Sequence, residues 1–94
     1  MFDISKTGKD TLRLAGRFDA SQAEKAEAAL NEIDGACVID CEELDYISSA
    51  GLGALVATFH RLAASGERIT LANVNAHIRD IFRISGLDQL FDFT

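Results

Sequence analysis

The 94-residue sequence predicts an α/β domain built on a single-layer mixed β-sheet of four or five strands, with helices packed against the sheet. Two observations lead to this prediction. Short apolar runs of strand length alternate with longer stretches in which apolar residues recur at helical spacing. The order strand, helix, strand, helix, strand and helix requires crossover connections, so part of the sheet is expected to be parallel. The chain has no Pro and no internal repeat, and residues 1–94 are therefore predicted to form one domain.

The N-terminal third predicts a β-hairpin followed by a helix. Apolar and polar residues alternate on both sides of a turn at residues 8–10, which is typical of two paired strands. Apolar residues at helical spacing then predict a first helix over residues 22–33. We expect Ser21 and Glu24 to form a capping box at its start, because their types and spacing match that motif.

The rest of the chain predicts a buried strand followed by further helices and strands. The apolar run at residues 36–41 is typical of a strand that is covered on both faces. A broad apolar stripe between Leu52 and Ala63 predicts a helix that must pack on the sheet. The remaining predicted elements are a strand at residues 69–71, a helix that Asn75 caps and Gly86 ends, and an edge strand at residues 90–93.

Charge and composition exclude several functions. Fifteen acidic and nine basic residues give a net charge of −6, which repels the phosphates of nucleic acids and of anionic lipids. No apolar run approaches the ~20 residues of a membrane span, and the first residues lack a signal-peptide pattern, so a cytoplasmic location is expected. Cys37 and Cys41 are predicted to be reduced core thiols, because a metal site needs more Cys or His ligands at suitable spacing. We expect no metal, no cofactor and no nucleic-acid partner.

The residues best placed for chemistry lie where the central strand ends and the long helix begins. Ser48 and Ser49 stand at a helix start, where unpaired backbone N–H groups and the helix dipole attract phosphate. Gly51 and Gly53 follow, although each glycine inside a helix costs about 0.5–1 kcal/mol relative to alanine. Two interpretations remain equally open on these residues alone. One is a site that needs close approach, and the other is an N-cap with small residues that let the helix pack tightly.

Three segments resemble the STAS domain proteins, in particular the bacterial anti-sigma-factor antagonists. Residues 16–19, Gly-Arg-Phe-Asp, stand where the family has a Gly-Glu-Leu-Asp-like element. The run from Tyr46 to Gly53 resembles the family motif Asp-Ser-Ser/Thr-Gly-Leu-Gly, ahead of which comes an aromatic–aliphatic pair. Residues 75–87 are similar to the family's late helix, which ends in Phe-x-x-Ser/Thr-Gly-Leu. The resemblance covers nearly the whole chain and implies the same STAS-like fold.

By this resemblance, Ser49 occupies the position of the serine that a cognate kinase phosphorylates, which ends the complex between kinase and antagonist. Ser48 stands where the family usually has Asp, and Ala50 stands where it has a second Ser or Thr. The implied function is that of an anti-sigma-factor antagonist, with an anti-sigma factor serine kinase and a serine phosphatase as partners. The residues expected to contact the partner or the phosphate are Asp19, Ser48, Ala50, Gly51, Leu52 and Gly53.

Other acidic residues near this junction have open roles. Asp19 lies at a second strand-to-helix junction, next to Ser49 if the two strands are neighbours. Its carboxylate is expected either to contact the Ser49 hydroxyl or a phosphate donor, or to serve as a turn or helix cap. Glu42, Glu43 and Asp45 are interpreted first as a solvated loop and second as an acidic surface that faces the partner.

The chain is expected to be a substrate and not an enzyme. It has no Gly-x-x-x-x-Gly-Lys loop and none of the kinase signatures, so nucleotide and catalytic base must come from the partner. A serine-hydrolase elbow is disfavoured, because Ile47 stands where the elbow's first glycine belongs. The alternative function is a non-phosphorylated STAS adaptor subunit in a stressosome-like or lipid-transport complex.

Overall fold

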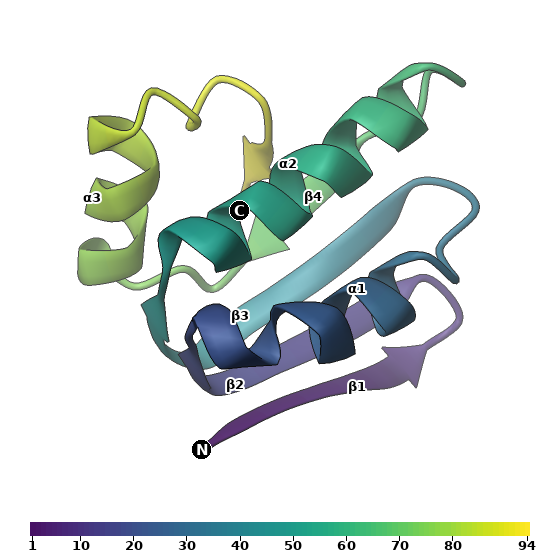
Figure 1. Cartoon of the computed structure of the whole chain (residues 1–94). Helices are drawn as coiled ribbons and strands as arrows, with labels where there is room; N and C mark the ends of the chain where they lie inside the picture. The colour runs from purple at the N-terminus through teal and green to yellow at the C-terminus, as the bar shows by residue number, and fades with distance from the viewer.

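A computed structural model describes all 94 residues and contains five strands and three α-helices (Figure 1). The strands are β1 (Phe2–Gly8), β2 (Thr11–Phe18), β3 (Cys37–Ile47), β4 (Ile69–Ala72) and β5 (Asp92–Phe93). The helices are α1 (Ala23–Leu30), α2 (Ser49–Ala63) and α3 (Ala76–Ile84), and a 3-10 turn, η1 (Ala20–Gln22), precedes α1. No helix is both long enough and apolar enough to cross a bilayer.

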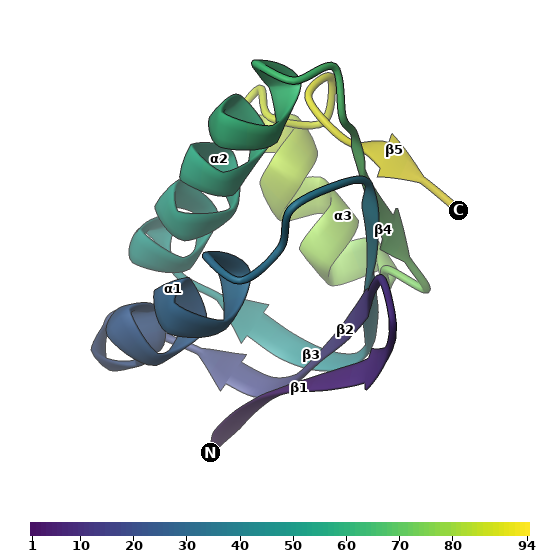
Figure 2. The ribbon, with the colours of Figure 1, turned by 90° about the vertical axis from the view of Figure 1, so that its right-hand side faces the viewer.

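The five strands form one mixed sheet in the order β1-β2-β3-β4-β5. The hairpin strands β1 and β2 are antiparallel, whereas each pair from β2 to β5 is parallel. The helices gather on one side of the curved sheet, and no helix covers the other side (Figure 2). The predicted α/β fold, with helices packed against a mixed sheet of four or five strands, is therefore confirmed, and the sheet has five strands.

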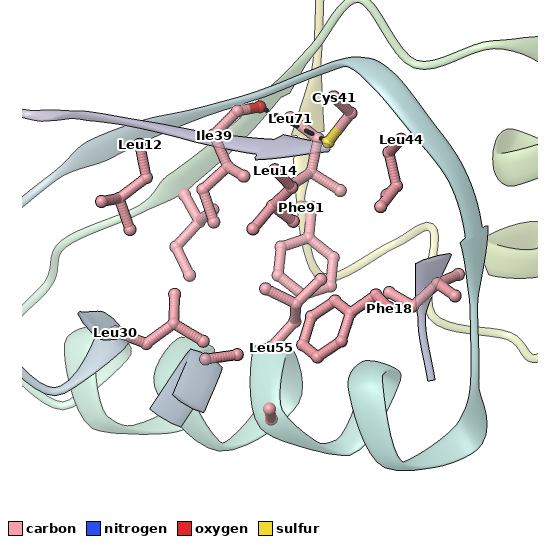
Figure 3. Packing of buried hydrophobic residues seen from close by; sticks show 14 of the residues in the cluster. Leu12, Leu14, Phe18, Leu30, Ile39, Cys41, Leu44, Leu55, Leu71 and Phe91 are labelled. Carbon is pink, nitrogen blue, oxygen red and sulfur yellow. Dashed lines mark hydrogen bonds between the residues drawn. The ribbon is translucent and has the colours of Figure 1, made fainter. Parts of the chain in front are cut away.

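The core lies between the sheet and the helices (Figure 3). Burial alternates along β2, where Leu12, Leu14 and Phe18 point inward, because successive side chains of a strand point to opposite faces. The ring of Phe18 is fully buried and stacks on Phe2 with a centroid distance of 4.6 Å. The packing of Phe18 fixes the end of β2 against the first turn of α2.

The start of α1 differs from the predicted capping box. The hydroxyl of Ser21 donates a 2.6 Å hydrogen bond to Oδ1 of Asp19, and Gln22, the residue that precedes α1, makes no side-chain cap. Asp19 instead caps η1, since the same carboxylate oxygen accepts from the backbone N–H of Ser21 at 3.1 Å. Asp19 lies two residues before Ser21, the expected cap. It caps the turn in place of Ser21, because Asp side chains readily accept hydrogen bonds from backbone N–H groups two residues ahead.

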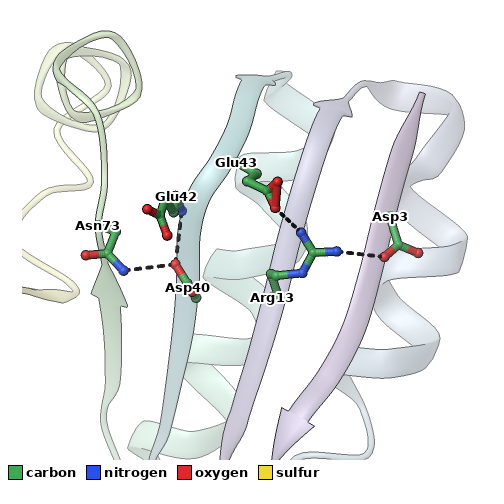
Figure 4. Close-up of polar contacts among 6 residues, drawn as sticks. All are labelled: Asp3, Arg13, Asp40, Glu42, Glu43 and Asn73. Atoms are coloured by element: carbon green, nitrogen blue, oxygen red, sulfur yellow. Dashed lines mark hydrogen bonds and ion pairs between the residues drawn. The ribbon is translucent and has the colours of Figure 1, made fainter.

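The central strand β3 is longer than predicted and is covered on one face only. It runs through Ile47, so Glu42, Glu43 and Asp45 belong to the strand, and their interpretation as a loop is wrong. An irregularity in the β2–β3 register places one extra residue on β3 between Asp40 and Glu43, which lets an acidic pair interrupt the alternation. Arg13 forms ion pairs with Glu43 and with Asp3 across the uncovered face (Figure 4).

Arg61 of α2 fixes the position of the C-terminal end of α1. Its guanidinium donates to the carbonyl oxygens of Leu30, at 2.9 Å, and Ile33, at 2.8 Å. These acceptors belong to the last turn of α1 and the chain just beyond it, where carbonyl groups lack helical partners and the helix dipole favours a cation. Glu67 holds the same connection further along, because its carboxylate accepts from the backbone N–H of Ala36 at 2.9 Å.

Replacement of Arg61 by Ala is expected to lower the free energy of unfolding by about 1–2 kcal/mol, because two charge-assisted hydrogen bonds are lost. Equilibrium urea denaturation measures this change. Arg83→Ala is the matched control, since Arg83 makes only a surface ion pair with Asp80 at 3.1 Å and its loss should cost less than about 0.5 kcal/mol. Equal destabilisation by the two variants would contradict the anchoring role of Arg61.

Candidate functional site

The two strand-to-helix junctions singled out in the sequence lie side by side. The parallel strands β2 and β3 end in register, with Phe18 opposite Ile47. The backbone N–H of Ser48 donates to the carbonyl oxygen of Phe18 at 2.8 Å, which ties the start of α2 to the end of β2. Asp19 and Ser49 therefore follow neighbouring strands at one edge of the sheet, as expected for the carboxyl ends of parallel strands.

Ser48 is the N-cap of α2. Its backbone is extended, with φ −86° and ψ 171°, and its hydroxyl oxygen accepts from the N–H of Gly51 at 3.1 Å. Its carbonyl oxygen accepts the first helical bond, from Leu52 at 2.9 Å. Ser is among the residues that perform this role best, and Asp is another. The residue type at position 48 therefore keeps the helix cap while leaving it uncharged.

Ser49 is the first residue of α2, and its side chain is exposed. Its hydroxyl makes no hydrogen bond within the chain, in contrast to the half-buried Ser48 hydroxyl. The N–H groups of Ser49 and Ala50 have no helical partner, because they belong to the first turn and the cap satisfies only Gly51. The first turn contains no acidic residue. Ser49 thus presents a free hydroxyl to solvent at the positive end of a 15-residue helix.

The two glycines of the motif have different environments. A methyl group added at Gly51 would lie 2.9 Å from Cγ1 of Ile47 and 3.1 Å from Cγ of Phe18, both of which are buried. Gly51 therefore lets α2 pack directly on the ends of β2 and β3. A methyl group added at Gly53 would meet nothing within 4 Å, and Gly53 is exposed. Nothing inside the chain accounts for a glycine at position 53.

The remaining predicted site residues divide between surface and core. Gly53 lies one helical turn after Ser49, so both belong to one exposed face of α2. Ala50 is half-buried, and Leu52 is partly buried with its side chain against the core. Asp19 makes no hydrogen bond with Ser49; its Oδ1 accepts from the backbone N–H and the hydroxyl of Ser21 instead.

One charged residue at this edge is absent from the set chosen from sequence. The guanidinium of Arg17 lies over the ring of Tyr46, 4.4 Å from its centroid, on the uncovered face of the sheet. The two residues are opposite each other in the β2–β3 register, so their contact can be recognised only once this register is known. Arg17 is exposed, and its partner Tyr46 lies two residues before Ser48. The guanidinium therefore places a cation near the start of α2.

The two thiols are buried, and their surroundings favour the protonated form at neutral pH. Burial, with a contribution from the carboxylate of Asp10, raises the pKa of Cys37 to about 11. Burial and the nearby carboxylate of Asp40 raise the pKa of Cys41 to about 12. Both side chains are buried and stay protonated, whereas the reactive and metal-binding form is the thiolate. No group of three or more His, Cys, Asp or Glu residues is arranged to hold a metal ion.

Alanine substitutions at the two glycines are expected to have opposite effects on stability. Gly51→Ala should destabilise the chain by about 1–3 kcal/mol, because the methyl group overpacks against Ile47 and Phe18. Gly53→Ala should stabilise it by about 0.5–1 kcal/mol, because alanine is the better helix former and the site is open. Urea or thermal unfolding of the two variants checks both signs. Destabilisation by Gly53→Ala would show that this glycine has an internal structural role.

Comparison with known proteins identifies the family of this chain. A family model described as "Mlab, STAS domain" matches residues 2–92. BtrV of Bordetella bronchiseptica is 33% identical over 82 residues, which cover 83% of this chain and 71% of BtrV. The anti-sigma-B factor antagonist of Bacillus subtilis is 27% identical over 96 residues, which cover 98% of this chain and 88% of that protein.

Solved structures show the same fold. The anti-sigma factor antagonist SpoIIAA in its unphosphorylated form superimposes with a TM-score of 0.76 at 22% identity, over 100% of this chain and 88% of SpoIIAA. The Bacillus cell fate determinant SpoIIAA in its phosphorylated form gives a TM-score of 0.71 at 21% identity, over 100% of this chain and 91% of the other. With the match to the family model over nearly its whole length, the chain belongs to the STAS domain family.

Proposed function

We propose that this chain is an anti-sigma factor antagonist that binds an anti-sigma factor with serine kinase activity and is released when that kinase phosphorylates Ser49. The curated relatives from Bacillus subtilis and Listeria monocytogenes are named anti-sigma-B factor antagonists, and the latter is 30% identical over 83 residues. If this chain is regulated by phosphorylation, it must present a serine that the active site of the partner kinase can reach.

The single observation that supports this proposal most is the uncommitted, exposed hydroxyl of Ser49. A kinase must place a hydroxyl in line with the γ-phosphate of its nucleotide, which demands an accessible side chain. Ser48 is less suitable, because its oxygen accepts the capping bond from Gly51 and its side chain is half-buried. The cap therefore separates the roles of two adjacent serines, one for the fold and one for the switch.

The switch follows from the charge that phosphorylation adds. A phosphate brings about −1.5 to −2 charges, which the N–H groups and dipole of the α2 N-terminus tolerate locally. The fold of the free chain is therefore expected to survive phosphorylation. A partner surface packed on Ser49 and Gly53 would instead have to bury or repel this charge. A 10²-fold loss of affinity needs only about 2.8 kcal/mol of differential interaction, which one dianion at an interface readily supplies.

The chain acts as the substrate in this scheme, and its partner supplies the nucleotide and the catalytic base. Return to the binding form then requires a serine phosphatase, since a phosphate monoester is not lost spontaneously on a useful timescale. The neutral cap Ser48 affects the charge around the phosphorylated residue. The cap residue is uncharged and the first turn of α2 contains no acidic residue, so phosphorylated Ser49 would meet no like-charge repulsion from its own helix start.

Incubation with an anti-sigma factor kinase from the same genome and ATP is expected to add one phosphate to the chain, and peptide mapping should locate it at Ser49. Ser49→Ala should abolish the modification. Ser48→Asp is the matched control, because Asp preserves the cap and the variant should still be phosphorylated. Modification of Ser48, or an unchanged mass of the wild-type chain with every such kinase, would contradict the proposal; the second result favours the adaptor function.

Gly53→Ala is expected to weaken binding of the unphosphorylated chain to the anti-sigma factor by at least about tenfold, or about 1.4 kcal/mol, although it stabilises the free chain. The reason is that the partner approaches the bare backbone at Gly53, one turn from Ser49. Ala57→Ser, which adds one atom a further turn along the same exposed face, is the matched control and should change affinity less. Isothermal titration calorimetry measures both. Unchanged affinity in Gly53→Ala would remove Gly53 from the interface.

A further inference from the structure

The outer edge of β1 has no partner within the chain. β1 and β5 are the edge strands of the sheet, and β5 contains only 2 residues, whereas β1 contains 7. No helix or loop lies beyond β1 in the plane of the sheet (Figures 1 and 2). An open edge of this length presents a row of unpaired backbone N–H and C=O groups, which is a template for pairing with another strand.

The bonds to β2 determine which backbone groups of β1 point outward. In an antiparallel pair, residues that bond to the neighbouring strand alternate with residues whose N–H and C=O groups point away from it. The N–H of Arg17 donates to the carbonyl oxygen of Met1 at 2.8 Å, so Met1 bonds to the β2 side. The residues of β1 in the same phase as Met1 are Asp3 and Ser5. The backbone groups of residues 2, 4 and 6 therefore face the open edge.

Helix α1 and the chain just after it follow the same edge and carry opposite charges at their two ends. Nζ of Lys25, in the first turn of α1, donates to the carbonyl oxygen of Phe2 at 3.5 Å, so Lys25 lies at the start of β1. Glu32 comes about two helical turns later, on the same side of the helix, and lines one pocket with Lys6. Lys25 and Glu32 are exposed, and neither forms an ion pair. α1 therefore runs alongside β1 in the same direction.

We propose that two copies of this chain associate through β1, which pairs antiparallel with β1 of the second copy about a twofold axis at Ile4. In this register Ile4 lies opposite Ile4 of the second copy, and Phe2 lies opposite Lys6, so the outward backbone groups of all three residues bond to one another. A shift of one residue would set these groups against groups that already bond to β2. A shift of two residues would leave Phe2 or Lys6 without a partner, because the strand is irregular between Lys6 and Gly8.

The twofold axis also brings opposite charges together. It places the Phe2 end of one β1 beside the Lys6 end of the other, so Lys25 of each copy faces Glu32 of the other. The Lys6 end carries a surplus of one carboxylate, since the charged residues that line the pocket there are Asp10, Glu32 and Asp34 against Lys6 and Lys9. An unrelated strand would meet the open backbone groups but not this arrangement of charge, which is the reason for assigning a second copy.

Ser49 lies outside this interface. It follows β3, and β2 separates β3 from β1 in the sheet. The pairing therefore goes beyond the proposed function, and a pair of chains would present two Ser49 side chains. Tests of the pairing need no kinase, so their outcome does not depend on phosphorylation.

Sedimentation equilibrium of the full chain tests the association. We expect a monomer–dimer equilibrium with a dissociation constant of about 0.1 mM or below. Lys25→Glu and Glu32→Lys should each raise this constant at least about fivefold, although they change the net charge in opposite directions, and the double reversal should restore it. Glu27→Lys is the matched control, because Glu27 is exposed and lies two positions after Lys25, on another side of α1. A monomer at concentrations up to about 1 mM, or single reversals no more effective than Glu27→Lys, would overturn the proposal.

Disulfide cross-linking tests the register. With Ile4 on the axis, Asp3 lies opposite Ser5 of the second copy at a Cα–Cα distance of about 4.5 Å, which a disulfide can span. Two copies of Asp3, or two copies of Ser5, lie diagonally at about 7–8 Å, beyond that reach. A mixture of Asp3→Cys and Ser5→Cys chains with oxidised glutathione should therefore form disulfide-linked dimers at least about fivefold faster than either variant alone. The native Cys37 and Cys41 are buried and do not compete. Equal rates in the mixture and in either variant alone would overturn the register.

Discussion

The close packing of Gly51 on Phe18 and Ile47 is the contact on which the rest of the site depends. Phe18 and Ile47 are the last residues of the two neighbouring parallel strands, and both side chains are buried. Because Gly51 has no side chain, the first turn of α2 rests directly on them. The same contact leaves Ser48 to cap the helix and Ser49 to point outward. One missing methyl group thus sets the orientation of the exposed serine.

The fold was largely predictable, because its signals are local. Period-two alternation in residues 2–18 and the apolar stripe of α2 each identify an element from neighbouring residues alone. The caps at Ser48 and Asn75 belong to the same class, and both serve as their types suggest. The length of β3 was not predictable, because the extra residue between Asp40 and Glu43 breaks the alternation that a strand normally shows.

The site was only partly predictable for a different reason. The sequence places two serines and two glycines at a helix start, but it does not show which of them have a structural role in the fold. Burial and hydrogen bonding divide them: Ser48 and Gly51 are needed by the fold, and Ser49 and Gly53 are not. The sequence allows two roles for Asp19, and its bond to the hydroxyl of Ser21 depends on side-chain geometry that no residue pattern encodes. Contacts across strands, such as Arg17 with Tyr46, require the register.

The two ends of the central strand β3 have different surroundings. At the carboxyl end of β3 lies a free hydroxyl beside unpaired N–H groups, and at its amino end lies a pocket lined by both apolar and charged residues. The long α2 contributes to both ends, because its start carries Ser49 and its last turns carry the Arg61 anchor of the pocket wall. A close-packed core lies between the two ends and keeps them in fixed positions.

Ser49 is, by the central claim made for this chain, a surface group on a helix whose position Gly51 fixes independently of modification. A crystal structure of the chain with phosphoserine at position 49 examines that claim most directly. We predict that α2 stays seated on Phe18 and Ile47, that Ser48 keeps its bond to Gly51, and that the phosphate lies in solvent at the helix start. A phosphate enclosed by the core, or a first turn of α2 lifted away from the sheet, would contradict it.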